Sequence, residues 1–189
     1  MSRRPALSLS LYLQDRHVLL FGDGEGADER AKRLERANAS VYRIASGDWQ
    51  ELAESNNSAK KFDLAIANSN DAAANRCLAL WARAQGILAY AHDQPEVSDF
   101  AFPALARRGA LQIAISTEGV APALAAQLRR HLTALLDSGG QELDRIVIQL
   151  EQIREKFPRG RERMNLLKQI AKRVRHVGKL TIEDEEISG

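Results

Sequence analysis

Three small residues near the amino terminus have the spacing of a dinucleotide-binding turn. Gly22, Gly24 and Ala27 form the pattern Gly-x-Gly-x-x-Ala directly after the apolar run 16–21. In such a turn the first glycine permits a tight bend, and the second lets the backbone approach a pyrophosphate. The third small residue allows a helix to pack closely on the strand. We therefore expect a dinucleotide site here, with a glycine turn that binds no ligand as the alternative.

The residue type that usually binds the ribose of such a cofactor is missing from its place. An aspartate or glutamate commonly stands about 20 residues after the first glycine, at the end of the second strand. This sequence has Tyr42, Arg43, Ile44 and Ala45 there. Arg43 could meet the 2′-phosphate of NADP, or it could be a solvated arginine at a strand edge, and we favour the second interpretation. The choice between NAD and NADP stays open on this evidence.

Polar residues also follow two later apolar runs. Asp93 comes just after the run 87–91, and open α/β sheets bind their ligands beyond the carboxyl ends of their strands. An aspartate in that place can accept a proton, while a turn or cap aspartate is the alternative. Asn70 and Asp71 follow the run 62–67, and by type alone they indicate the cap of a helix.

The sequence offers no pattern of metal ligands. His92 lies beside Asp93, but a lone histidine in a polar loop more often has no chemical role. The other histidines are scattered over separate elements: His17, His131 and His176. We therefore expect no permanent metal site. Cys77 is the one cysteine, which excludes an intrachain disulfide, and its apolar and helix-forming neighbours indicate that it is buried.

Strands alternate with helices over the first part of the chain, and this order predicts an α/β fold with a mostly parallel, Rossmann-like sheet. Short apolar runs indicate buried strands, and patterns of period 3.6 indicate helices. We expect Asn38 and Gly86 to end the two helices. The predicted strands are 16–21, 41–44, 62–67 and 87–91, the predicted helices are 27–37 and 71–85, and a hairpin follows at 100–105 and 110–115.

From Pro122 onward the pattern is helical. We expect a helix with an apolar stripe from Leu124 to Leu136, a linker at 137–140, and further helices over 143–157 and 162–177. The predicted domains are accordingly 1–116, a Rossmann-like dinucleotide-binding domain, and 117–189, a helical dimerisation and substrate-cleft region. The last helices are rich in lysine and arginine, which suits an anionic substrate, although a solvated helical face explains most of these residues better.

Net charge and the lengths of the apolar runs bear on whether the protein binds nucleic acid or membrane. The formal net charge is +2 over 189 residues, and no apolar run approaches the roughly 20 residues that span a bilayer. A nucleotide-sensing regulator that binds nucleic acid through its basic helices is a rival hypothesis. It lacks a helix-turn-helix spacing and aromatic residues for base stacking. We expect a soluble, cytoplasmic protein that binds neither nucleic acid nor membrane.

Three segments resemble a known family. They are residues 13–27 (LQDRHVLLFGDGEGA), 92–100 (HDQPEVSDF) and 112–122 (QIAISTEGVAP), and they are similar in order and spacing to the amino-terminal module of sirohaem synthase. The resemblance implies a precorrin-2 dehydrogenase that uses NAD and yields sirohydrochlorin, with ferrous iron inserted by some members. It also implies a homodimer. Some members carry a methyltransferase module, and because none follows Gly189 we expect a standalone type.

The resemblance implies roles for individual residues. Asp93 matches the family's key carboxylate and is the expected catalytic base. The implied substrate-binding residues are His92, Ser116, Thr117 and Gly119. The expected cofactor-binding residues are Gly22, Gly24, Glu25, Gly26, Ala27, Ser46, Gly47, Ser69, Asn70 and Asp71.

Three residues depart from the family pattern. Asp23 replaces a glycine of the turn, Tyr90 replaces the asparagine before the key aspartate, and Ala121 replaces a serine. A carboxylate near a pyrophosphate lowers affinity if it points inward, and Tyr90 changes the hydrogen bonding of the cleft. These departures keep an alternative open, a non-catalytic tetrapyrrole- or metal-binding relative of the same fold.

Overall fold

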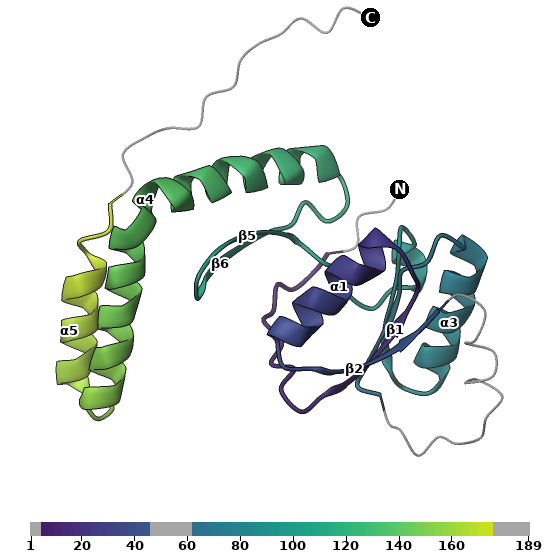
Figure 1. The fold of residues 1–189 in the computed structure, drawn as a ribbon, viewed down its shortest axis with the longest axis horizontal. Helices are drawn as coiled ribbons and strands as arrows, with labels where there is room; N and C mark the ends of the chain where they lie inside the picture. Colours follow the sequence, from purple (N-terminus) through teal and green to yellow (C-terminus); the bar gives the residue numbers. More distant parts are fainter. Residues whose placement is uncertain (1–4, 46–61, 176–189) are drawn as a thin grey trace, which may run out of the picture. The chain divides into compact units, whose positions relative to one another are not determined.

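The computed structural model describes residues 5–45 and 62–175 of the chain (Figure 1). Contacts divide it into two compact units: the first spans Pro5–Phe102, and the second begins at Pro103. The hairpin expected at the end of the first domain thus belongs to the second unit.

The first unit is a parallel sheet with helices on both faces. Its four strands lie in the order β2-β1-β3-β4, and every neighbouring pair is parallel. This confirms the predicted Rossmann-like class. The elements are β1 (His17–Phe21), α1 (Glu25–Arg36), β2 (Ser40–Ile44), β3 (Leu64–Ala67), α3 (Ala72–Ala84), β4 (Leu88–Ala91) and the short 3₁₀ helix η1 (Pro95–Val97).

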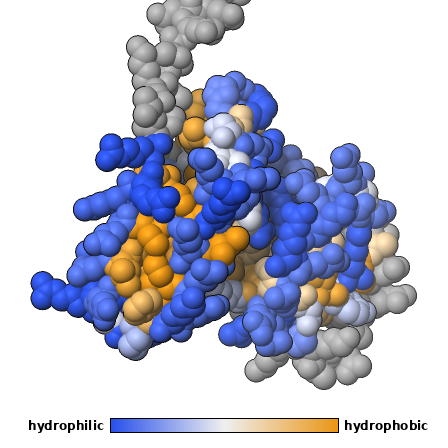
Figure 2. Space-filling model, turned by 60° about the vertical axis from the view of Figure 1, so that its left-hand side comes forward, coloured by the Kyte–Doolittle hydropathy of each residue, from blue (hydrophilic) through white to orange (hydrophobic). Residues whose placement is uncertain are grey.

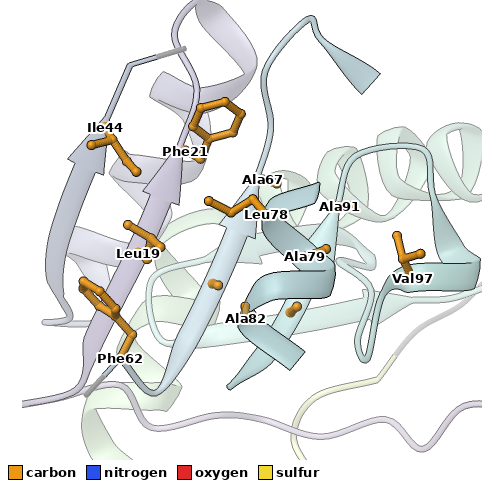
Figure 3. Packing of buried hydrophobic residues seen from close by; sticks show 12 residues of the cluster. Leu19, Phe21, Ile44, Phe62, Ala67, Leu78, Ala79, Ala82, Ala91 and Val97 are labelled. Atoms are coloured by element: carbon orange, nitrogen blue, oxygen red, sulfur yellow. The ribbon is translucent and has the colours of Figure 1, made fainter. Parts of the chain in front are cut away.

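The core of this unit lies on both faces of the sheet, because side chains alternate along a strand. Leu19 and Phe21 of β1 join a cluster with α3 (Figure 3). Val18 and Leu20 join a second cluster with Leu34 of α1. All four residues of β1 in these clusters are fully buried, and burial of each Leu or Phe side chain contributes roughly 1.5–3 kcal/mol. The strands are therefore fixed from both sides.

The ends of the two helices follow their local sequence. Asn38 adopts a left-handed φ of 56° after α1, and Gly86 has φ 73° after α3. Asp71 caps α3 by accepting a hydrogen bond from the Ala74 amide. Cys77 is exposed, so the expectation that it is buried is wrong. The buried face of α3 contains Asn75, Leu78, Ala79 and Ala82, and Cys77 lies off that stripe.

The second unit contains the hairpin and the long helices. It consists of β5 (Ala104–Arg108), β6 (Leu111–Ile115), α4 (Pro122–Lys156) and α5 (Arg161–Ala171). The hairpin is a separate antiparallel sheet. No helix in the described ranges is both long enough and apolar enough to cross a membrane.

Residues 137–140, expected as a linker, include the point where α4 divides into two helical segments across a kink. The helix is kinked at Gly140, whose φ is 45° and ψ is −137°. Arg108 of the hairpin holds both sides of the kink: its Nη1 donates to Asp137 Oδ1 at 3.1 Å, and its Nη2 donates to Asp144 Oδ2 at 2.7 Å. Arg108 Nε also donates to the Gly140 carbonyl at 3.2 Å. The break expected between two helices is thus present at Gly140, and Arg108 supports the helical segments on both of its sides.

Candidate dinucleotide and substrate site

The predicted site residues of the first unit follow strands whose ends are in register. Phe21 pairs with Ile44 on one side and with Ala67 on the other, and Ala67 pairs with Ala91. Each of these is the last residue of its strand. The glycine turn, the loop after β3 and the loop that contains Asp93 therefore start from one edge of the sheet, where open α/β folds bind ligands.

The glycine turn adopts a backbone that only glycine accommodates easily. Gly22 has φ 131° and Gly24 has φ 87°. A Cβ at Gly22 would lie 2.4 Å from the Asn68 carbonyl oxygen, whereas a Cβ at Gly24 would meet nothing within 4 Å. Gly22 is thus required by the protein's own packing. Gly24 instead leaves open space beside the backbone, as the approach of a ligand requires.

Small residues at the start of α1 let other groups come close to its backbone. Gly24 stands at the N-cap of the helix and has no side chain that could accept from the first amides. Ala27 is 1% exposed against the sheet. A Cβ at Gly26 would lie 2.8 Å from Asn68 Nδ2, which explains glycine at this helical position. Glu25 is exposed in the first turn.

Arg43 is bound to the glycine turn. Its Nε donates to the Gly22 carbonyl at 3.0 Å, and its Nη1 donates to Asp28 Oδ1 at 2.7 Å. Arg43 stands on the edge strand β2 with a side chain that is 36% exposed, as the favoured interpretation expects, and it is in addition bonded to the turn and to α1. The guanidinium joins β2, the turn and α1.

A buried polar network shapes the loop after β3. Asn75 accepts hydrogen bonds from the Ser69 amide and hydroxyl at 3.0 and 2.8 Å, and its Nδ2 donates to the Ser69 carbonyl at 2.9 Å. Ser69 is 5% exposed and Asn75 is 2% exposed. Asn70 and Asp71 are exposed on the same loop. The network fixes the backbone that presents these two residues.

The loop after β4 presents the predicted base in a tight turn. The His92 amide donates to the Ala67 carbonyl at 2.9 Å, and the Gln94 amide donates to the Ala91 carbonyl at 3.2 Å. Between them Asp93 takes a left-handed φ of 55°. Its side chain is 88% exposed, with Oδ2 3.6 Å from His92 Nε2. Asp93 therefore projects from a fixed backbone with its carboxylate accessible.

Tyr90, the departure beside the predicted base, lies in an aromatic cluster. Its ring is 5.0 Å from that of Phe102 and 5.9 Å from that of Phe100. The Arg30 guanidinium lies over the Phe102 ring at 3.8 Å, and burial lowers the pKa of Arg30 from its usual value. Tyr90 Oη also lies 3.5 Å from His92 Nδ1. The tyrosine thus links α1 to the loop of Asp93.

The remaining predicted residues belong to the second unit or lie outside the described residues. Ser116, Thr117 and Gly119 belong to the second unit, in the turn before α4. Ser116 Oγ accepts from the Glu118 amide at 3.2 Å, and Thr117 Oγ1 accepts from the Ala121 amide at 3.3 Å. Both hydroxyls thus support the turn. Ser46 and Gly47 lie outside the described residues.

Two neighbours of the turn were not among the predicted site residues. Asn68 packs against both Gly22 and Gly26, and its place directly after a buried strand was a usable signal. Asp28 binds Arg43, which depends on the register of β2 with β1 and has no local signal. Among the described residues, no group of three or more His, Cys, Asp or Glu side chains is placed to hold a metal ion.

Comparison with protein families supports a nucleotide-binding fold. The family described as "Putative NAD(P)-binding" matches residues 9–104, about half of the 189 residues. A second family, described as "Sirohaem biosynthesis protein central", matches residues 108–135. The two matches fall in order along the chain.

Individual relatives agree with these families. The siroheme synthase of Methylococcus capsulatus is 33% identical over 172 residues, which cover 83% of this chain and 36% of that protein. The siroheme synthase of Methylobacillus flagellatus is 30% identical over 172 residues, covering 83% and 37%. The chain thus spans little more than a third of the length of these curated relatives.

A solved structure has the same fold. SirC, precorrin-2 dehydrogenase, matches with a TM-score of 0.66 at 20% sequence identity, over 87% of this chain and 89% of that one. At this identity the likeness establishes the arrangement of the elements.

Proposed function

Because the chain belongs to the family described as "Putative NAD(P)-binding" and also matches the family described as "Sirohaem biosynthesis protein central", we propose that it oxidises precorrin-2 to sirohydrochlorin with NAD, in the cytoplasm. The observation that carries the proposal is the shared sheet edge. The glycine turn follows β1 and Asp93 follows β4, and the ends of both strands are in register through β3. A dinucleotide and a proton acceptor therefore have places at one edge.

The residues present fit a nicotinamide dinucleotide. Gly24 leaves open space, and α1 begins without a side-chain cap, so its first amides can donate to a pyrophosphate. When bound, the nicotinamide accepts the hydride. Arg43 supports NAD over NADP, because its Nε and Nη1 are used by Gly22 and Asp28 and not left for a 2′-phosphate.

Asp93 is the proposed general base. Loss of two hydrogens from precorrin-2 releases a hydride and a proton, and a carboxylate at the carboxyl end of a strand can accept that proton. The exposure of the Asp93 side chain and its fixed turn support this role. His92, next to Asp93 in the chain, is a proposed substrate-binding residue. Iron insertion into sirohydrochlorin is a secondary proposal, in which Asp93 takes a pyrrole proton.

The second unit is proposed to bind substrate and to form a homodimer. Ser116, Thr117 and Gly119 are the proposed substrate-binding residues, and the domain of 117–189 is the proposed cleft and dimerisation region. The second unit exposes apolar side chains bordered by hydrophilic ones (Figure 2). These include Leu124, Leu135, Ile148 and Met164, and burial of such a surface favours association.

Replacement of Asp93 tests the assignment. Asp93→Ala should lower kcat by about 10²-fold or more, while NADH binding stays at the wild-type level. Glu96→Gln is the matched control, since Glu96 is an acid of the same loop that pairs with Arg76. Retained turnover in Asp93→Ala would remove Asp93 from the mechanism. Absence of turnover in the wild type would favour the non-catalytic relative.

A further inference from the structure

We propose that Asp28 accepts the hydrogen bond of the adenosine ribose 2′-hydroxyl, and that Arg43 positions Asp28 for this contact. The proposal rests on the dinucleotide binding proposed above and names the residues that decide which dinucleotide is bound. Asp28 belongs to α1, whereas the acid of a typical dinucleotide fold stands at the end of the second strand.

The end of β2 carries a cation where an acid is usual. The described residues of this strand and its continuation, 40–45, include no Asp or Glu. Arg43 is the penultimate residue of β2 and pairs with Leu20, one residue before the last pair, Phe21 with Ile44. The guanidinium therefore emerges beside the first residue of the glycine turn, and its 3.0 Å bond to the Gly22 carbonyl confirms this place.

Arg43 holds the Asp28 carboxylate beside the glycine turn. Its Nη1 donates to Asp28 Oδ1 at 2.7 Å, the length of a charge-assisted hydrogen bond. Asp28 directly follows Ala27, the last small residue of the turn pattern. The Asp28 amide donates to the Gly24 carbonyl at 3.0 Å, so its backbone is fixed as well. The pair thus supplies the acid that β2 lacks.

The carboxylate has capacity for a ligand. Arg43 uses Oδ1, and among the described residues no hydrogen bond to Asp28 Oδ2 is formed. The side chains of Asp28 and Arg43 are 52% and 36% exposed. A ribose hydroxyl can donate to Oδ2 without displacing Arg43, because a carboxylate accepts several hydrogen bonds.

The same pair discriminates against a 2′-phosphate. A phosphate in place of the hydroxyl brings its negative charge next to the Asp28 carboxylate, and the two like charges repel. The charge of Arg43 is already paired with Asp28. Removal of the carboxylate should free the guanidinium, and a free arginine at this place is the group that accommodates the 2′-phosphate of NADP.

Single and double variants of the full chain test the proposal, with NADH and NADPH binding read by fluorescence. The wild type should bind NADH more tightly. Asp28→Ala should weaken NADH binding about tenfold or more, the range of a charge-assisted hydrogen bond, and should tighten NADPH binding. In the double variant Asp28→Ala with Arg43→Ala, the gain in NADPH binding should disappear. Glu29→Gln, next to Asp28 but paired with Arg33, should leave both affinities unchanged.

The outcomes separate this proposal from the proposed function. If the wild type binds NADH and Asp28→Ala leaves the ratio of the two affinities unchanged, Asp28 does not contact the ribose and only the present proposal fails. If the wild type binds neither dinucleotide, the proposed function fails and this proposal fails with it. Asp28→Asn, which keeps the shape of the side chain, should weaken NADH binding while its thermal unfolding stays close to that of the wild type.

Discussion

Asn75 and Ser69 form a closed pair of hydrogen bonds beneath the loop after β3. Asn75 Nδ2 donates to the Ser69 carbonyl at 2.9 Å, and Asn75 Oδ1 accepts from the Ser69 hydroxyl at 2.8 Å. Asn75 is 2% exposed, so water cannot replace these bonds. Asn75 thus supports the backbone of the loop that presents Asn70 and Asp71, two of the predicted cofactor-binding residues.

Asn75→Ala should destabilise the protein by about 2–3 kcal/mol, because it leaves the buried polar atoms of Ser69 without their partner. Urea unfolding followed by circular dichroism measures the loss. Asn70→Ala, from the exposed part of the same loop, should change stability by less than about 0.5 kcal/mol. Equal effects of the two substitutions would mean that the network does not stabilise the loop.

The two glycines of the turn should respond differently to alanine. Gly24→Ala meets no neighbouring atom and should cost about 1–3 kcal/mol for its backbone conformation alone. Gly22→Ala adds a clash with the Asn68 carbonyl and should lower the melting temperature much further or prevent folding. The folded Gly24→Ala protein should bind NADH more weakly. Gly22→Ala with the same melting temperature as Gly24→Ala would contradict the packing described here.

Asp63 should make stability depend on acid pH. The backbone N–H of His17 donates to its carboxylate at 2.8 Å, and this bond, with Arg16, lowers the pKa of Asp63 below its usual value. A carboxyl group whose pKa is lowered by folding stabilises the folded protein at pH values above its unfolded pKa, about 3.9. This stabilisation is lost as the pH falls through the lower pKa of the folded state. Thermal unfolding should show the wild type more stable than Asp63→Asn at pH 7. That difference should shrink below about pH 4, and a difference that persists at pH 2 would exclude this origin.

Arg108 should stabilise the kinked helix of the second unit. Arg108→Ala removes the donors to Asp137, Gly140 and Asp144, so hydrogen exchange in α4 should become faster near Gly140. Arg107→Ala is the matched control, because the bond that Arg107 makes within the described residues is to the Gly109 carbonyl of its own turn, at 3.0 Å. Unchanged exchange in Arg108→Ala would show that the helix holds its kink without the hairpin.

The local part of the fold could be predicted from the sequence, and the long-range part could not. The strand, glycine turn and helix from His17 to Arg36 follow from neighbouring residues, and the structure contains all three. The break expected at 137–140 is present as a kink at Gly140, where the local glycines predict it. The bonds from Arg108 to Asp137 and Asp144 come from a residue distant in sequence, and local patterns do not reveal them.

The candidate site shows the same division. Gly22, Gly24 and Asp93 stand after strands that their own sequence identifies, so their common sheet edge could be foreseen. The bond between Arg43 and Asp28 depends on how β2 registers with β1, and single residue types do not reveal it. Cys77 was misplaced for a related reason, since apolar neighbours do not fix the phase of a helix.

Anaerobic turnover of the purified protein with precorrin-2 and NAD⁺ tests whether it is a dehydrogenase. NADH absorbance and the spectrum of sirohydrochlorin should grow together, and Asp93→Ala should abolish both signals. Ferrous iron added afterwards tests iron insertion in the same sample. Absence of both signals with NAD⁺ and with NADP⁺ would show that the protein does not oxidise precorrin-2.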